Sequence, residues 1–100
     1  MPYVYALAEH GRTLATRPLG EMLREDLIEK AAGEEIVELD FTDVLGASHS
    51  FADEFVARLA EEAESDKVGF AVTLVGASDD VERVIRRALD RRELSLPQPA

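Results

Sequence analysis

Ser48, His49, Ser50 and Asp53 are the only closely spaced residues of this chain whose types could carry out catalysis together. A serine nucleophile needs a base and an orienting acid that converge on it, and these partners usually come from separate elements of the fold. Side chains that follow one another on a loop do not usually meet. We therefore expect no enzyme, with a small hydrolase built on His49 as the least favoured function, and we expect His49 to be an exposed loop residue.

Asp40 and Asp43 flank the end of a predicted strand and raise the question of a metal site. Such a site needs several converging ligands, and the chain has only two histidines and no cysteine. We expect Asp43 to hydrogen-bond within a turn and Asp40 to face solvent or a cap. The six glycines are dispersed, so no glycine-rich phosphate loop is present. The sequence predicts neither a metal nor a cofactor.

Composition is typical of a single folded domain with an acidic surface. The chain has 100 residues, 46% hydrophobic and 32% charged, and a net charge of −10. Such a surface repels nucleic acid and anionic lipid. No stretch approaches the roughly 18 apolar residues of a membrane span, and no secretion signal opens the chain. We expect a cytoplasmic domain over residues 1–96, with a disordered tail over 97–100.

Four segments of the sequence are typical of strands. Tyr3–Ala8 and Thr13–Thr16 are separated by a short polar turn, which predicts an N-terminal hairpin. Ile36–Phe41 and Val68–Val75 are compact apolar runs, as expected of strands that are covered on much of their surface. Leu94–Leu96 could add a short edge strand.

Three segments carry apolar residues at helical spacing. The first helix begins near Pro18 and ends at Gly33. The second begins at Ser50, which we expect to be its N-cap, with Asp53 at the third position of the helix. The third begins after Ser78 or Asp79. It carries five arginines that alternate with acids: Arg83, Arg86, Arg87, Arg91 and Arg92. This pattern favours a solvated helix face whose charges pair with one another, and the alternative is a face that binds an acidic protein partner.

The order of elements is therefore β-β-α-β-α-β-α, an α/β fold. Helices that connect successive later strands imply parallel neighbours in a mixed sheet, with the helices packed mainly on one face. The other face would carry Ile36, Ala71, Thr73 and Val75. This face is either lightly covered or used for homodimerisation.

The segment Ile36–Phe41, together with Ser48–Phe55, resembles the STAS-like domain family of uncharacterised function. The motif is an apolar strand that ends in Asp-Phe, followed by Ser-x-Ser-Phe-Ala-Asp at the start of a helix. Thr16–Gly20 is similar to the family's entry into its first helix. The resemblance covers roughly residues 3 to 93.

The broader resemblance is to STAS domains, which include the bacterial anti-sigma factor antagonists. The resemblance implies a small switch whose protein partner is a kinase-like ATPase or an anti-sigma-type regulator. In the antagonists, a kinase-like ATPase phosphorylates a serine at the start of a helix. The resemblance places Ser50 at that serine and Ser48 at the preceding aspartate. Phe51 and Ser48 depart from the antagonist pattern, which has glycine and aspartate there.

Physical chemistry gives this resemblance a mechanism. A phosphate on Ser50 would add a charge of about −1.5 to −2 at a helix N-terminus. The helix dipole would stabilise this negative charge, while the carboxylates of Asp40, Asp43 and Asp53 would repel it. We therefore predict a regulatory protein-binding module with Ser50 or Ser48 as the phosphorylated residue, and a homo-oligomerising scaffold as the alternative. The partner-binding residues are predicted on the loop and on the second helix: Asp40, Asp43, Gly46, His49, Asp53, Glu54 and Arg58.

Overall fold

The computed structural model describes residues 1–98. Its strands are β1 (Tyr3–Ala6), β2 (Thr13–Leu14), β3 (Ile36–Asp40), β4 (Gly46–Ala47) and β5 (Ala71–Val75). Its α-helices are α1 (Arg17–Lys30), α2 (His49–Ala52), α3 (Arg58–Glu64) and α4 (Asp79–Arg91). A 3₁₀ turn follows β1 (Leu7–His10), and a π turn joins α2 to α3 (Asp53–Ala57). Because α2, the π turn and α3 are contiguous, residues 49–64 form one helical run, and the predicted α/β class is confirmed.

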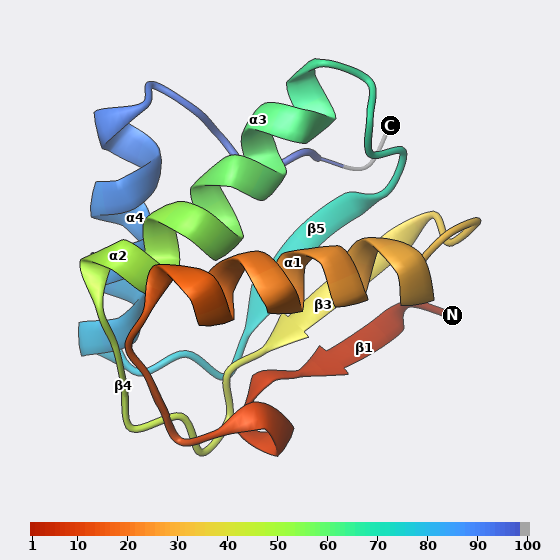
Figure 1. Cartoon of the computed structure of the whole chain (residues 1–100). Helices are drawn as coiled ribbons and strands as arrows, with labels where there is room; N and C mark the ends of the chain where they lie inside the picture. The colour runs from red at the N-terminus through yellow and green to blue at the C-terminus, as the bar shows by residue number, and fades with distance from the viewer. Residues whose placement is uncertain (99–100) are drawn as a thin grey trace.

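The central sheet has the strand order β1-β3-β5, and both of its strand pairs are parallel. Tyr5 lies beside Leu39, which in turn lies beside Leu74. A separate small ribbon forms where β2 pairs with β4, again in parallel. Figure 1 shows α1 and the run that ends in α3 crossing one face of the sheet, with α4 beside them.

The predicted N-terminal hairpin is wrong, and so is the expectation of a mixed sheet. Leu7 is fully buried, and the 3₁₀ turn that it opens redirects the chain between β1 and β2. The two strands therefore pair with different partners, β1 with β3 and β2 with β4. The sequence predicted a tight turn at residues 9–12, but the 3₁₀ turn over Leu7–His10 ends β1 before that point.

The predicted edge strand at Leu94–Leu96 is also absent from the described residues. The segment nevertheless runs beside the sheet, since the Val72 amide donates a hydrogen bond of 2.9 Å to the Pro97 carbonyl. Pro97 thus contacts the sheet although the sequence predicted a disordered tail from this residue on. The part of that predicted tail at residues 99–100 lies outside the described residues.

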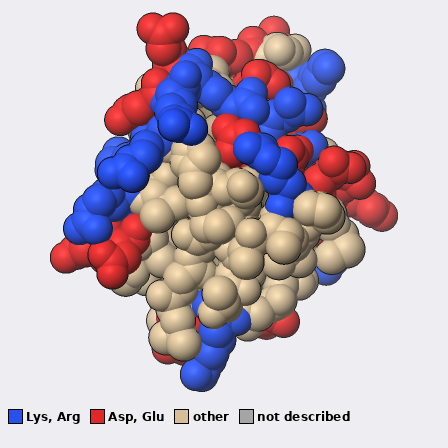
Figure 2. Space-filling view, turned by 60° about the vertical axis from the view of Figure 1, so that its left-hand side comes forward, with Lys and Arg blue, Asp and Glu red and all other residues tan. Residues whose placement is uncertain are grey.

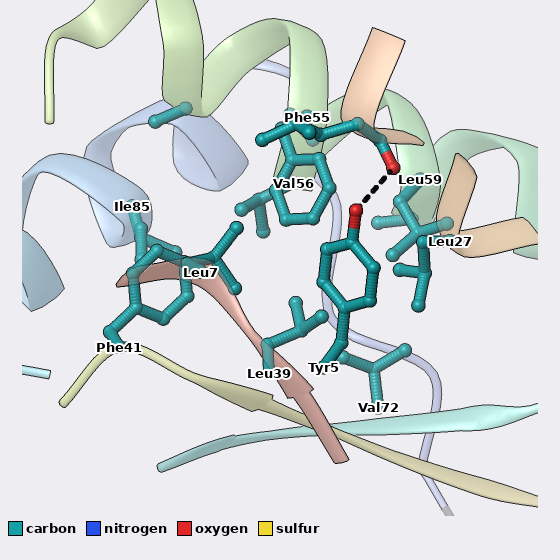
Figure 3. Packing of buried hydrophobic residues seen from close by; sticks show 14 of the residues in the cluster. Tyr5, Leu7, Leu27, Leu39, Phe41, Phe55, Val56, Leu59, Val72 and Ile85 are labelled. Carbon is teal, nitrogen blue, oxygen red and sulfur yellow. Dashed lines mark hydrogen bonds between the residues drawn. The ribbon is translucent and has the colours of Figure 1, made fainter. Parts of the chain in front are cut away.

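The core lies between the sheet and the helices. Figure 3 shows Tyr5 and Leu39 pointing from the sheet toward Phe55 and Leu59 of the helical run. The Tyr5 hydroxyl donates a hydrogen bond of 2.8 Å to Asp26. Burial, together with this hydrogen bond, raises the pKa of Tyr5. The buried phenol therefore ties β1 to α1 without carrying a charge.

Helix α1 packs very closely on the helical run at Gly20. A Cβ atom at this position would lie 3.0 Å from the Glu54 Cβ and 3.1 Å from the Phe51 carbonyl oxygen. Both distances are shorter than ordinary van der Waals contacts, so only glycine fits without a local shift. This approach brings the first turns of α1 next to the π turn.

The opposite face of the sheet is partly open. Of the residues predicted for it, Thr73 and Val75 are exposed, Ile36 is half-buried and Ala71 is buried. Val4, which lies beside Glu38 of β3, adds a second exposed apolar side chain to this face. No helix within residues 1–98 combines the length and the apolar character that crossing a membrane requires.

Candidate functional site

Two stretches without formal charge meet at the β2–β4 ribbon. Residues 13–16 and 44–52 contain no Asp, Glu, Lys or Arg, although these four types make up 32% of the chain. The ribbon joins them, and the bonds continue on both sides: the Leu45 amide donates to the Arg12 carbonyl at 2.8 Å, and the Ser48 amide to the Leu14 carbonyl at 2.9 Å. We use the term ribbon surface for the exposed and half-buried side chains of residues 13–16 and 45–50.

Leu45 is the most exposed apolar side chain on the ribbon surface. It is 72% exposed, whereas its neighbour Val44 is buried in the core. Figure 2 shows the side of the molecule that carries β4, α2 and α4, with a broad uncharged area bordered by rows of basic side chains. This area is unusual in a protein whose net charge is −10.

Ser48, and not Ser50 as predicted, is the N-cap of the helical run. Its Oγ atom accepts a hydrogen bond of 3.0 Å from the Phe51 amide and donates one of 2.7 Å to the Ala15 carbonyl. The second bond fixes the choice between the two serines, because only Ser48 reaches the β2 side of the ribbon. The Ser48 hydroxyl group therefore already acts as both a hydrogen-bond donor and a hydrogen-bond acceptor.

Ser50 lies one residue inside the helix and is half-buried. Within residues 1–98 its hydroxyl group makes no hydrogen bond. His49, the first helical residue, is also half-buried rather than fully exposed as predicted, and its Nε2 atom lies 3.3 Å from Nη1 of Arg91 on α4. The contact joins the start of α2 to the end of α4.

Asp40 and Asp43 lie on the chain segment between β3 and β4. The Asp40 carboxylate accepts a hydrogen bond of 2.9 Å from the Thr42 amide, and its hydrogen bonds to Thr42 lower its pKa. Asp43 is exposed and has a φ angle of 69°, in the left-handed region that aspartate tolerates in turns. Asp40 therefore caps a turn and Asp43 belongs to it, while Gly46 pairs with Thr13 in the ribbon. No group of three or more potential metal ligands occurs within the described residues.

Asp53 is held away from the ribbon surface in a network of arginines. It is 7% exposed and accepts hydrogen bonds from Arg17 at 2.7 Å and from Arg92 at 2.6 and 2.9 Å. The bonds from Arg92 lower the pKa of Asp53 well below its ordinary range, those from Arg17 act in the same direction, and burial opposes them. Asp53 therefore joins α1 and α4 to the helical run and offers little surface to a partner.

Glu54 belongs to the same network. Its Oε2 atom lies 2.7 Å from Nη1 of Arg24, a buried residue of α1 that also donates to the Glu54 carbonyl. The hydrogen bond from Arg24 lowers the pKa of Glu54. Arg58, one turn later, is half-buried and lies 4.0 Å from Glu54. Of these two predicted binding residues, Arg58 presents the larger part of its side chain to solvent.

The π turn places Asp53 among buried apolar residues and leaves Glu54 half-buried beside it. The turn adds a residue to one helical turn, and Asp53, Phe55, Val56 and Ala57 are all buried along it. Sequence reasoning missed both this turn and the arginines that surround it. The available signal was the pair Asp53-Glu54 between the apolar residues 51–52 and 55–57, since buried carboxylates require cationic partners.

Fold and site together define a small α/β domain with a parallel central sheet and a helix that starts from a capped loop beside that sheet. A family model described as a STAS-like domain of unknown function matches residues 20–82. The chain belongs to this family, and the resemblance noted in the sequence is confirmed. The matched range includes Ser48, Ser50 and the π turn. No curated protein and no solved structure matches the chain.

Proposed function

We propose that this domain is a regulatory protein-binding module, comparable with the anti-sigma factor antagonists, and that it docks its partner through the ribbon surface. The observation that carries the proposal is the meeting of two uncharged stretches around Leu45, which is 72% exposed. Exposed apolar side chains within a continuous uncharged area mark protein interfaces, because partner binding removes them from water.

A photo-crosslinking amino acid at position 45 tests the docking surface in cells of the source organism. The expected result is a covalent adduct with one partner protein. Met22 supplies the control because it is also an exposed apolar residue, at 57%, and lies on α1 outside the ribbon surface. Adducts of equal yield at positions 22 and 45, or none at position 45, would contradict the proposal.

We further propose Ser50 as the residue that a kinase-like ATPase partner phosphorylates. The Ser50 hydroxyl group makes no hydrogen bond to any of residues 1–98, whereas the Ser48 hydroxyl donates one and accepts one. A phosphate on Ser50 would lie in the first turn of the helical run, where free amides and the helix dipole stabilise it. It would also add negative charge beside the ribbon surface and so weaken the docking of a partner.

Intact mass of the protein from its native cells, followed by fragment mapping, tests this assignment. The expected phosphate maps to Ser50 and disappears in Ser50→Ala. Ser48→Ala serves as the second variant, and it should retain the phosphate. A phosphate that maps to Ser48, or to neither serine in cells that contain the crosslinked partner, would overturn the assignment.

The open face of the sheet supports a second candidate function, a homo-oligomerising scaffold. Val4 is 51% exposed and Val75 is 38% exposed, and both belong to this face. Light scattering over a range of concentrations decides the matter. A dimer that Val4→Lys converts to a monomer would favour the scaffold, and a monomer at every concentration would exclude it.

A further inference from the structure

Helix α4 carries a stripe of three arginines, two of which form no ion pair within residues 1–98. Arg83, Arg87 and Arg91 follow one another at intervals of four residues, so they lie on one face of the helix, and all three are exposed. Arg83 bonds to Asp80 at 2.8 Å. Within residues 1–98, neither Arg87 nor Arg91 forms an ion pair with a carboxylate. We call these three residues the arginine stripe.

The arginine stripe is unfavourable for the helix that carries it. Arg87 has an arginine four residues before it and another four residues after it, and like charges at this spacing destabilise a helix by about 0.2–0.5 kcal/mol per pair. The same helix does pair its other arginines: Arg86 bonds to Glu82 at 2.9 Å. Asp90 follows Arg87 by three residues and lies in the same shallow hollow, yet within residues 1–98 it forms no ion pair with Arg87 or Arg91.

The arginine stripe borders the ribbon surface. Nη1 of Arg91 lies 3.3 Å from Nε2 of His49, the residue that follows the ribbon at the start of α2. One shallow hollow on α4 is lined by four arginines and one acid: Arg83, Arg86, Arg87, Arg91 and Asp90. In Figure 2 a row of basic side chains runs along the edge of the uncharged area. A partner that covers Leu45 would therefore meet these guanidinium groups.

We infer that the partner is an acidic protein segment, whose carboxylates meet the arginine stripe and whose apolar side chain covers Leu45. The inference rests on the proposed ribbon surface and specifies the chemistry of what binds there. Guanidinium groups bind carboxylates in a bidentate manner, and a protein with a net charge of −10 would otherwise repel an acidic partner. The stripe gives such a partner a local region of opposite charge.

Selection from a displayed library of random dodecapeptides on the folded domain tests the inference. The expected peptides combine several acidic residues with a large apolar one. A synthetic peptide of the most enriched sequence should lose about tenfold or more in affinity for Arg87→Glu, because a charged contact is replaced by repulsion. Lys67→Glu is the matched control: it makes the same change of charge at an exposed residue in the loop before β5, and it should change affinity by no more than about twofold.

Three results would overturn the inference: enrichment of no peptide or of peptides without an acidic excess, equal losses in Arg87→Glu and Lys67→Glu, or tighter Arg87-dependent binding of an oligonucleotide. Leu45→Ser separates this failure from a failure of the proposed function. Loss of binding in Arg87→Glu but not in Leu45→Ser would support the acidic segment and reject the ribbon surface. The reverse pattern would support the ribbon surface and reject the arginines as its charged neighbours.

Discussion

The arginines around Asp53 and the arginines along α4 meet opposite surroundings. Arg17 and Arg92 converge from two helices on one buried carboxylate. Arg87 and Arg91 stand in solvent next to like charges, with no carboxylate bonded to them within residues 1–98. An arginine that pairs with a buried carboxylate holds elements of the fold together. An exposed arginine without a bonded carboxylate is available to a partner. The two regions therefore separate stability from binding, and they can be tested separately.

Asp53→Ala should give the largest loss of stability. Removing one partner from a buried ion pair costs about 3–5 kcal/mol, and because Arg17 and Arg92 are partly exposed and can regain water, we expect about 2–3 kcal/mol. Urea unfolding measures this change. Asp80→Ala is the control, since Asp80 pairs with Arg83 in full view of solvent and should cost less than about 1 kcal/mol. Equal losses in the two variants would remove the distinction between the regions.

The same network should set the response of the domain to acid. The pKa values of Asp53 and Glu54 are lowered by their hydrogen bonds from Arg92 and Arg24, respectively. Their stabilising contribution is therefore complete above the unfolded pKa of about 4 and is lost as pH falls through the folded values. Urea unfolding from neutral pH to about pH 3 should show a fall in stability that is shallower in Asp53→Ala. An identical pH dependence in both proteins would mean that this carboxylate is not the group being protonated.

Replacing the two serines at the start of the helix should change the free energy of unfolding by smaller amounts than Asp53→Ala. Ser48→Ala removes the N-cap and the bond to Ala15, which should cost about 1–2 kcal/mol and lower the melting temperature by several degrees. Ser50→Ala removes a hydroxyl group without a bonded partner within residues 1–98 and should change stability by less than about 0.5 kcal/mol. Thermal unfolding of both variants decides which serine is structural. A larger loss in Ser50→Ala would reverse their assigned roles.

The elements predicted correctly from the sequence are those set by local patterns. The periodic apolar residues of α4 and the compact run of β5 required no knowledge of distant partners. The hairpin failed because the pairing of β1 depends on β3, more than thirty residues later. The N-cap was misplaced by two residues for a similar reason. Ser48 and Ser50 are equivalent as local signals, and the Ala15 carbonyl that distinguishes them comes from β2's end of the ribbon.

The candidate site was predicted in part, and the errors have a common physical cause. The loop from Gly46 and the serines do lie on the ribbon surface, but Asp53 and Glu54 were expected to face a partner. Their burial depends on the π turn and on the close approach of α1 at Gly20. Neither feature has a periodicity that a single sequence reveals. Polar residues were therefore assigned to the surface, although three arginines from other helical segments compensate their charges inside.

Arg87→Glu should have a small effect on stability, and it should be stabilising. The new carboxylate would stand four residues from Arg83 and from Arg91, which turns two repulsive pairs into attractive ones. It would also stand three residues from Asp90, which adds one repulsive pair, so the net gain should be about 0.5 kcal/mol. Arg86→Glu makes the same chemical change one residue earlier, where it breaks the pair with Glu82, so it should lower stability by a similar amount. Thermal unfolding at low salt, where surface charges are least screened, measures both. An Arg87→Glu protein that is more stable but no longer binds acidic peptides would show that the arginine stripe destabilises its own helix and is needed for partner binding. A less stable Arg87→Glu protein would show that Arg87 has an internal structural role.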